Sequence, residues 1–433
     1  MSTTIEEMKA LINKIKRNLK HFGPGIITGA ADDDPSGIAT YSQAGAQFGY
    51  SLLWTSLFFL PLQTAVQEAC ARIGAVTGQG IAAVIKNHYH KSLLSLVVIL
   101  LLIANTINIG ADIGAMAEAA RLIIPLPFGI LLLFFTASIL ILEIFTSYNV
   151  YSRILKWFAL TLLSYPITVF LINHPWETVL QATMIPHIEF SFPFLMILTG
   201  LLGTTISPYM FFWQASEEVE EEREAHLVRK NEYPHITPAF IRTMRIDTWV
   251  GMIASGIGAW AIILVASTVL HTHGITDIRT AADAAKALEP LVTTFPNAGY
   301  LAKCIFALGI IGLGLLSVPV LAGSTAYAFT EAFNMHEGLN LKLKKAHGFY
   351  GVITISTLVG LGINFLGIDP MKALVYTAVL NGVIAVPLIF IILRIAQDKT
   401  IMGAYTSGPL SRIVLWITFL TMAGSAVAMF FIR

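Results

Sequence analysis

Three consecutive carboxylates, Asp32 to Asp34, lie in an otherwise apolar stretch and are followed by Pro35 and Gly37. Proline removes a backbone donor and glycine accepts irregular dihedral angles, so a helix entering this stretch should break there. We expect Asp34 to bind a metal ion at the break, rather than only to cap a helix, and Gly37 to line the same site. Asp32 and Asp33 cannot both face the same direction as Asp34, because successive helical positions differ by about 100°. Holding metal-bound water and lining the inner vestibule are both open for them.

A second apolar stretch is interrupted in the same way, by the run Gly200-Leu201-Leu202-Gly203-Thr204-Thr205-Ile206-Ser207-Pro208-Tyr209. The Thr204 and Ser207 hydroxyls fall where the broken backbone needs partners, so metal ligation and support of the kink are both open. Gln214 lies on the same helical face as Ser207, either as a ligand or as a polar pore wall. Asn381 either supplies an amide to the metal site or joins two helices by a hydrogen bond.

Two further carboxylates could move protons or ions. Asp112 lies within an apolar stretch, and Glu118 follows it by about one and a half helical turns. We regard the pair as a candidate relay. The alternative for Asp112 is a structural partnership with Lys303 or with the backbone.

The composition places these residues in a membrane. Only 12% of the 433 residues are charged and 55% are hydrophobic, whereas a soluble domain carries about 25% charged residues. Such a chain cannot cover itself with water-facing side chains, so the lipid bilayer must be its main solvent. The net charge of +1 gives no case for nucleic acid. Cys70 and Cys304 both lie in apolar segments, which argues against a disulfide framework.

Eleven apolar stretches are long enough to be candidate membrane spans. The stretch 297–333 is too long for one straight span, so it should tilt or extend beyond the bilayer. The residues 1–22 form a separate basic amphipathic segment, expected to lie on the cytoplasmic membrane surface. The candidate spans lie near 23–47, 49–74, 92–121, 128–147, 152–173, 192–215, 246–271, 297–333, 347–366, 371–394 and 410–432.

The distribution of basic residues orients these spans. With the N-terminus inside, most of the 27 Lys and Arg residues fall in cytoplasmic segments, as the positive-inside rule requires. We therefore expect a multi-pass protein of the inner (plasma) membrane, with its N-terminus cytoplasmic and its C-terminus external. An odd number of spans is needed for this arrangement.

The two interruptions occupy corresponding places, the first span in each of two successive sets of five. Paired broken helices are typical of inverted-repeat transporters, whose substrate site lies near the bilayer midplane. We expect an all-α membrane protein with a 5+5 inverted repeat over residues 23–396, in which spans 1 and 6 are broken. Residues 397–433 would then form an accessory eleventh span.

The motifs in these spans resemble the Nramp family of divalent metal transporters. The resemblance covers most of the chain, from about Gly23 to the tenth span, and it implies a LeuT-like fold with Asp34 as the metal-binding aspartate. It rests on the motifs Gly23-Pro24-Gly25, Asp34-Pro35-Ser36-Gly37, Gln43-Ala44-Gly45-Ala46-Gln47-Phe48-Gly49-Tyr50, Ala111-Asp112-Ile113, Ala287-Leu288-Glu289-Pro290-Leu291, Phe306-Ala307-Leu308-Gly309 and Ala322-Gly323-Ser324.

The chain departs from the family pattern at its site. Gly37 replaces the asparagine of the family's Asp-Pro-Gly-Asn motif, and Ser207-Pro208-Tyr209 stands where the family has Met-Pro-His. Thr204 falls where an alanine carbonyl is usual, Leu315 replaces a glutamine, and the ninth span lacks the expected arginine pair. These changes resemble the Nramp-related magnesium transporters.

The chemistry of the remaining donors favours hard ions. A thioether selects softer metals, whereas carboxylate, hydroxyl, carbonyl and water oxygens suit Mg²⁺ and Mn²⁺. Mg²⁺ usually keeps several waters and binds through one or two carboxylates. Replacing asparagine by Gly37 removes a ligand and enlarges the cavity, which favours a partly hydrated ion.

We therefore expect a carrier of Mg²⁺, Mn²⁺ or both, working by alternating access as a monomer and without a resident cofactor. Protons remain a candidate co-substrate. The main alternative is a sodium-coupled carrier of amino acids or other small organic solutes, although three aspartates would repel a substrate carboxylate. A cation channel would need acidic rings about a symmetric pore, and an intramembrane enzyme would need a nucleophile–base pair or zinc motif that is not found.

Overall fold

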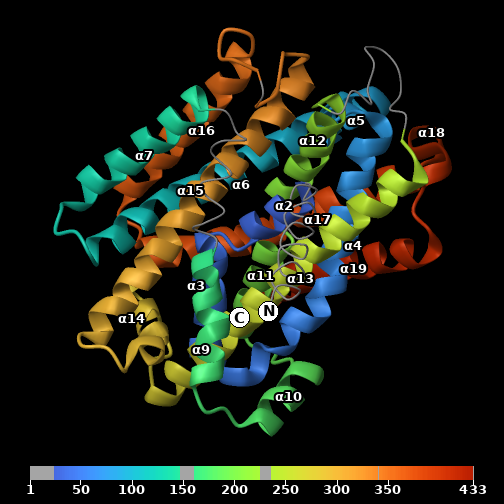
Figure 1. The fold of residues 1–433 in the computed structure, drawn as a ribbon. Coiled ribbons are helices and arrows are strands. Elements are labelled where there is room, and N and C mark those ends of the chain that lie inside the picture. The colour runs from blue at the N-terminus through green and yellow to red at the C-terminus, as the bar shows by residue number, and fades with distance from the viewer. Residues whose placement is uncertain (1–23, 147–159, 225–235, 340, 433) are drawn as a thin grey trace, which may run out of the picture.

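A computed structural model describes residues 24–146, 160–224, 236–339 and 341–432, and every element in these ranges is helical (Figure 1). Eight helical stretches in the described ranges are long and apolar enough to cross a membrane. The predicted basic segment 1–22 lies outside the described residues, as does the first part of the span predicted at 152–173. The domain boundaries proposed from the sequence stay predictions.

The first predicted span is broken where the sequence indicates. Helix α2 (Pro24–Asp32) ends before Asp34, and α3 (Pro35–Phe48) begins after it. Asp34 adopts an extended conformation and caps α3, while Pro35 occupies the first position of that helix. Proline tolerates this position because its missing N–H would have no helical partner there.

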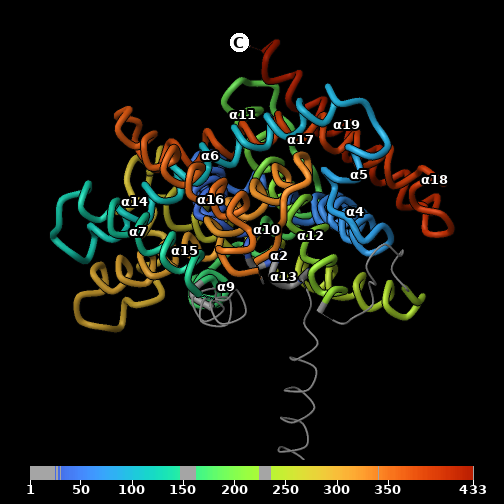
Figure 2. The backbone as a smooth tube through the Cα atoms, turned by 90° about the horizontal axis from the view of Figure 1, so that it is seen from above, coloured from blue at the N-terminus to red at the C-terminus, as the bar shows by residue number. Residues whose placement is uncertain are grey.

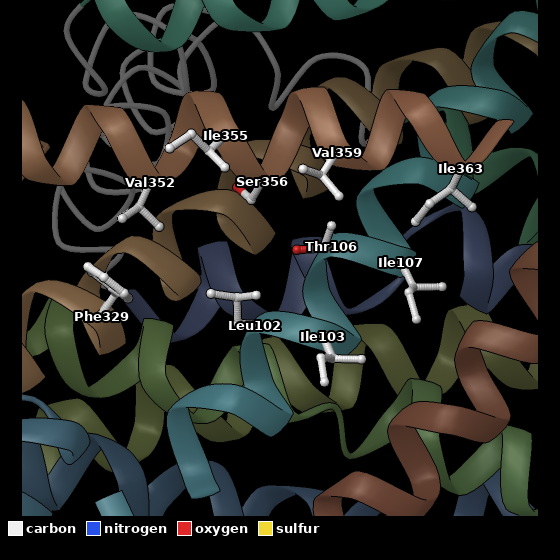
Figure 3. A pocket seen from close by; sticks show the side chains of 10 residues that line it. All are labelled: Leu102, Ile103, Thr106, Ile107, Phe329, Val352, Ile355, Ser356, Val359 and Ile363. Atoms are coloured by element: carbon white, nitrogen blue, oxygen red, sulfur yellow. The ribbon is translucent and has the colours of Figure 1, made fainter. Parts of the chain in front are cut away.

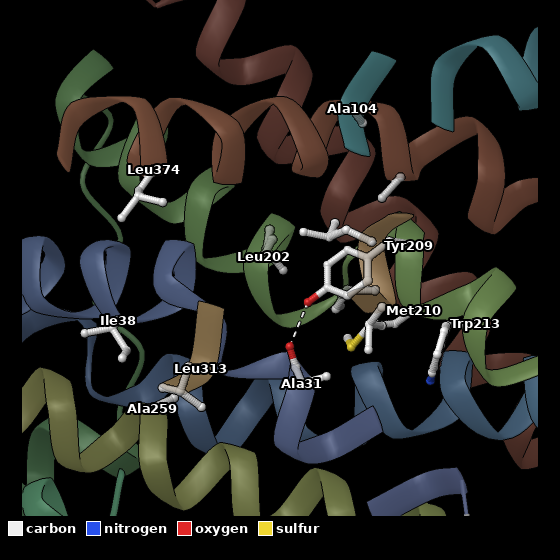
Figure 4. Close-up of a cluster of buried hydrophobic side chains, with 14 of the residues drawn as sticks. Ala31, Ile38, Ala104, Leu202, Tyr209, Met210, Trp213, Ala259, Leu313 and Leu374 are labelled. Atoms are coloured by element: carbon white, nitrogen blue, oxygen red, sulfur yellow. Dashed lines mark hydrogen bonds between the residues drawn. The ribbon is translucent and has the colours of Figure 1, made fainter. Parts of the chain in front are cut away.

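The sixth span is broken in the same way. Helix α11 (Phe192–Thr205) is followed by its C-cap Ile206, and α12 (Pro208–Glu224) begins with Pro208. The prediction of broken first and sixth helices is thus confirmed. The two breaks lie against each other, because the Tyr209 hydroxyl donates a hydrogen bond of 2.9 Å to the carbonyl of Ala31, near the end of α2 (Figure 4).

Most other predicted spans coincide with helices to within a few residues, and the long eighth span is one 36-residue helix. At 1.5 Å per residue that helix is about 54 Å long, well beyond the hydrocarbon thickness of about 30 Å. The remaining elements are η1 (Gly49–Leu52), α4 (Trp54–Thr77), α5 (Ile81–His88), α6 (Lys91–Arg121), α7 (Phe128–Phe145), η2 (Leu160–Leu163), α9 (Ser164–Leu171), α10 (Trp176–Met184), α13 (Pro238–Val269), η3 (His271–His273), α14 (Ala281–Ala285), η4 (Lys286–Val292), α15 (Ala298–Phe333), α16 (His347–Ile363), η5 (Asn364–Leu366), α17 (Pro370–Gln397), α18 (Lys399–Met402), η6 (Gly403–Tyr405) and α19 (Pro409–Phe431).

Helix packing brings distant segments around the two breaks. Helix α13 packs along both α2 and α3, α6 packs on α15, and α17 packs on α11 (Figures 1 and 2). The contact of α2 with α13 is a backbone contact, since a Cβ on Gly29 would lie 2.5 Å from the Gly251 carbonyl carbon. Only glycine permits this approach, which carries the end of α2 to the middle of α13.

The core beside the breaks is apolar and filled by large side chains. Tyr209, Met210 and Trp213 follow the sixth-span break on α12, and all three are fully buried (Figure 4). The Trp213 ring packs edge-on to Tyr327, with centroids 6.3 Å apart, and lies against Gly323. These contacts join α12 to α15.

An apolar groove of about 370 Å³ lies between α6, α15 and α16 (Figure 3). Its lining residues include two with polar side chains, Thr106 and Ser356, and the rest are apolar. A cation would find no charged or carbonyl ligand among the side chains that line this groove.

Candidate metal centre at the two helix breaks

Asp34 is held in place by donors from its own helix and from α6. Its Oδ1 accepts hydrogen bonds from the backbone N–H of Gly37 at 2.7 Å and from the Ser36 hydroxyl at 2.6 Å. Its Oδ2 accepts one from the Asn108 amide at 3.2 Å. The residue is 1% exposed, so this conformation closes the carboxylate off from solvent.

Gly37 brings the two breaks together. A Cβ on Gly37 would lie 3.2 Å from the Thr204 Oγ1 atom and 3.3 Å from the Tyr41 ring. Thr204 is 1% exposed, and its hydroxyl has no hydrogen-bond partner in the described part of the chain. Gly37 therefore lets α3 pack closely on α11, where the buried Thr204 hydroxyl without a described partner faces it.

Ser207 serves the backbone at the second break. Its hydroxyl contacts the carbonyl oxygens of Gly203 at 2.7 Å and Thr204 at 2.8 Å. These carbonyls lose their helical partners where α11 ends, so the hydroxyl replaces a backbone donor. Metal ligation by Ser207 stays a prediction, and support of the kink is the role that its contacts describe.

The other two predicted ligands differ in their surroundings. Gln214 is buried on α12, where it accepts a hydrogen bond from Thr28 of α2 and donates one of 2.8 Å to Glu218. Its side chain therefore joins α12 to α2. Asn381 of α17 is 1% exposed, and neither its amide nitrogen nor its oxygen has a partner among the described residues.

The two candidate relay residues lie in different environments. Asp112 is fully buried on α6, where its Oδ2 accepts a hydrogen bond of 3.0 Å from Ser317 of α15. Glu118 forms an ion pair of 3.1 Å with Arg121, whose side chain is half exposed. Asp112 thus lies one helical turn beyond Asn108, the residue that contacts Asp34. Glu118 instead belongs to the end of the helix.

The structure adds residues that the sequence reasoning did not single out. Asn108 contacts Asp34 from α6, and Ser255 of α13 contacts both Asp32 and Asp33. The spacing of Asn108 and Asp112, four residues apart on one helical face, was the available signal. No comparable signal marked Ser255, whose partners lie more than 200 positions away in the chain.

The donors at the breaks suit a hard cation that keeps part of its water. No group of three His, Cys, Asp or Glu side chains in the described ranges is placed to hold a metal ion together. A cation at Asp34 would therefore have at most two such side chains as ligands, Asp34 among them, and would complete its coordination with neutral oxygens. Mg²⁺ commonly binds through one or two carboxylates and retained waters.

Solved structures share this fold. The manganese transporter of Eremococcus coleocola superposes with a TM-score of 0.74 at 15% identity, over 95% of this chain and 85% of that chain. The nucleobase-cation-symport-1 transporter Mhp1 superposes with a TM-score of 0.55 at 14% identity, over 95% of this chain and 89% of that one. The predicted all-α, LeuT-like architecture is thereby confirmed.

Curated relatives match along nearly the whole chain. The divalent metal cation transporter MntH of Caldanaerobacter subterraneus is 26% identical over 417 residues, which is 93% of this chain and 90% of the relative. MntH of Clostridium acetobutylicum is 26% identical over 432 residues, 96% of this chain and 91% of the relative. The sequence model described as "Natural resistance-associated macrophage protein-like" matches residues 25–432. With that match over almost its full length, the chain belongs to the Nramp family.

Proposed function

We propose that this protein carries divalent metal cations across a membrane by alternating access, with the cargo bound between the breaks of the first and sixth spans. Relatives along the whole chain are named divalent metal cation transporters, and a protein of the same fold is named a manganese transporter. The proposal assigns the same class of cargo to this chain.

The observation that carries the proposal is the placement of Asp34. A carboxylate that is 1% exposed lies at a helix break, oriented by two donors of its own helix and one from α6. The nearby Thr204 hydroxyl has no partner in the described structure. Burying a charge in such surroundings is costly unless a counter-charge compensates it, and a bound cation supplies one.

The proposed cargo is Mg²⁺, Mn²⁺ or both. Position 207 carries a hydroxyl, and Asp34, Thr204 and Asn381 offer only oxygen or amide groups. Hard divalent ions prefer such ligands, whereas a thioether would favour softer ones. Mg²⁺ bound through the Asp34 carboxylate would complete its coordination with retained waters.

The proposed setting is the inner (plasma) membrane, with the N-terminus cytoplasmic and the C-terminus external. This orientation follows from the bias of Lys and Arg towards one set of loops. In it, α2 approaches the first break from the cytoplasmic side, and α3 continues to the external side.

The test is uptake by the full chain reconstituted in liposomes. The Asp34→Ala variant should stay folded and inserted but lose binding and transport of Mg²⁺ and Mn²⁺. The matched control is Asp277→Ala, which removes an exposed carboxylate paired with Arg279 and should transport normally. Near-normal uptake by Asp34→Ala would remove the site assignment.

The same proteoliposomes distinguish divalent-cation transport from the alternative function, sodium-coupled transport of amino acids. Uptake of an amino-acid panel should stay at the level of empty liposomes, with and without a sodium gradient. Sodium-dependent uptake of an amino acid, in the absence of divalent uptake, would overturn the proposal.

A further inference from the structure

Asp32 and Asp33 turn away from Asp34 towards α13. The Ser255 hydroxyl lies 2.6 Å from Oδ2 of Asp32 and 3.3 Å from Oδ1 of Asp33. The two aspartates are 0% and 2% exposed, and Ser255 is 3% exposed. Asp34 faces Asn108 of α6 instead, so the three consecutive carboxylates serve two different sides of the broken helix.

The Asp32–Asp33 pair has fewer described hydrogen-bond donors around it than its carboxylate oxygens can accept. A serine hydroxyl has one hydrogen to donate, yet it is the shared donor of two carboxylates. The Oδ1 atom of Asp32 has no partner in the described part of the chain. None of the ion pairs formed by the described residues includes either aspartate. Asp32 therefore has a buried oxygen without a described donor, and neither carboxylate has an ion-pair partner among the described residues to compensate its burial.

The carboxylates are closely packed against α13, and a small cavity lies next to their shared partner Ser255. A Cβ on Gly258 would lie 3.2 Å from Oδ2 of Asp33, so a glycine faces the second carboxylate one turn after Ser255 on α13. Ser255 also lines a cavity of about 10 Å³ together with Gln63, Thr205 and Tyr41. That volume is about the minimum for one water. The Oε1 atom of Gln63 has no partner among the described residues, so a buried acceptor adjoins this cavity.

We propose that Asp32, Asp33 and Ser255 form a second binding site for a hard divalent cation, distinct from the site at Asp34. The cation class rests on the proposed function, because the ion would be the transported one. The ligands would be two carboxylates and a hydroxyl, completed by water, which is a donor set suited to Mg²⁺ or Mn²⁺.

The position of the second site, on the α2 side of the break, would make it the next binding site for an ion that moves from Asp34 towards the cytoplasm. Asp32 is the last residue of α2, so the site lies on the α2 side of the break while Asp34 caps α3. In the proposed orientation an ion leaving Asp34 for the cytoplasm meets Asp32 and Asp33 next. The site also spans α2 and α13, so separation of these helices removes Ser255 from the ion and weakens its binding.

The test counts Mn²⁺ ions bound by the full chain in lipid nanodiscs at saturation, by equilibrium dialysis. Wild type should bind about two ions, through separate sites of one or two carboxylates each. Asp34→Ala should lose the first ion and keep the second, whereas the double variant Asp32→Asn/Asp33→Asn should do the reverse. Asp277→Asn, the exposed control, should bind as wild type.

Two single variants test the same site if the Asp32→Asn/Asp33→Asn protein does not fold. Ser255→Ala removes the shared hydroxyl, and Gly258→Ala places a methyl group against Asp33. Each should weaken the second ion and leave the first unchanged. One ion in wild type, lost in Asp34→Ala and unaffected by these variants, would overturn the second site and leave the proposed function standing. A wild type that binds no Mn²⁺ would instead contradict the proposed function.

Discussion

The residues at the two breaks fall into two groups: those proposed to bind the cation, and those that hydrogen-bond to the backbone. The Asp34 carboxylate is oriented by three donors, and the Thr204 hydroxyl is uncommitted among the described contacts. Ser207 and Tyr209 instead satisfy carbonyl groups that the breaks set free. Metal ligation by position 207 stays a prediction, and exchanging the atom that this side chain presents tests it.

Ser207→Met is expected to shift binding towards Cd²⁺ relative to Mg²⁺, because a thioether prefers soft ions. A change of about tenfold in the Cd²⁺/Mg²⁺ affinity ratio would correspond to about 1.4 kcal/mol. Isothermal titration calorimetry on the purified variant measures the ratio. Ser207→Ala is the matched control, since it removes the same hydroxyl without adding sulfur. Equal ratios in the two variants would mean that position 207 does not face the ion.

Sequence reasoning found Asp34 because the signal is local, a carboxylate beside Pro35 and Gly37 in an apolar stretch. It could place Asn108 on the face of Asp112, but it could not pair Asn108 with Asp34 or Ser255 with Asp32, which lie 74 and 223 positions apart. Nor could it pair Gln214 with Thr28, 186 positions away. These pairings depend on how helices pack, which side-chain periodicity does not encode.

Helix α2 is attached to two neighbouring helices by hydrogen bonds on its own side of the break. The backbone N–H of Gly25 donates a hydrogen bond of 2.7 Å to Asp247 of α13, and Thr28 donates one to Gln214 of α12. Both bonds lie beyond the break, away from α3. In the proposed alternating-access cycle, a movement of α2 away from α13 and α12 would break both bonds, so we expect them to favour the arrangement described here.

Thr28→Val should destabilise that arrangement, because valine keeps the shape of threonine but cannot donate to Gln214. We expect faster amide hydrogen exchange across α2 than in wild type, measured by mass spectrometry in nanodiscs. Thr136→Val is the matched control, since the Thr136 hydroxyl bonds only to the Leu132 carbonyl of its own helix. Unchanged exchange in α2 would show that the bond contributes nothing to that arrangement.

Glu337, in the segment between α15 and α16, gives a pH dependence with a definite sign. Burial raises the pKa of its carboxyl from 4.5 to about 7, although Arg223 and Thr330 act in the opposite direction. The folded protein then keeps a proton that the unfolded chain releases, so stability falls as pH rises from about 4.5 to about 7. The thermal midpoint should show this decline in wild type and less of it in Glu337→Gln. Glu177→Gln is the exposed control, and an equal decline in all three proteins would contradict the assignment.

Most membrane-spanning helices could be predicted, because a long run of apolar residues is a strong signal. The end of α12 and the start of α13 were predicted wrongly. Helix α12 continues to Glu224, about nine residues past the predicted end, although Glu218 and Glu222 are charged residues. Both are buried, and Glu218 is bonded to Gln214. Helix α13 begins at Pro238 rather than near 246, with Thr237 as its cap. A Thr-Pro pair is a recognisable signal for the start of a helix, but the predicted span was bounded by hydropathy alone and so began later.

At the scale of the whole molecule, the remaining question is what drives the ion across. Asp112 is buried near Asn108, and its Oδ2 is bonded by Ser317, while the arginine pair and histidine expected of a proton pathway are replaced. We therefore expect membrane potential and the concentration gradient to drive uptake. A divalent ion crossing the full field gains about 4.6 kcal/mol per 100 mV, twice the value for one charge.

This expectation is tested with a pH-sensitive dye inside proteoliposomes during Mg²⁺ or Mn²⁺ uptake. Uptake should respond to an imposed potential without acidifying the lumen, and Asp112→Asn should not change that result. Asp369→Asn is a suitable control, because Asp369 caps α17 outside this region. Metal-dependent acidification that Asp112→Asn abolishes would show that protons are co-transported through this carboxylate.

The packing of Trp213 gives the protein a built-in optical reporter. The indole lies one turn beyond Tyr209 on α12, fully buried, and a Cβ on Gly323 of α15 would lie 2.7 Å from its ring. Rotation of α12 against α15 must move the ring off that glycine and away from Tyr327, which changes the polarity and quenching that the indole experiences. In a background with the other six tryptophans replaced, the emission of this one residue would follow the transport cycle in real time without an attached dye.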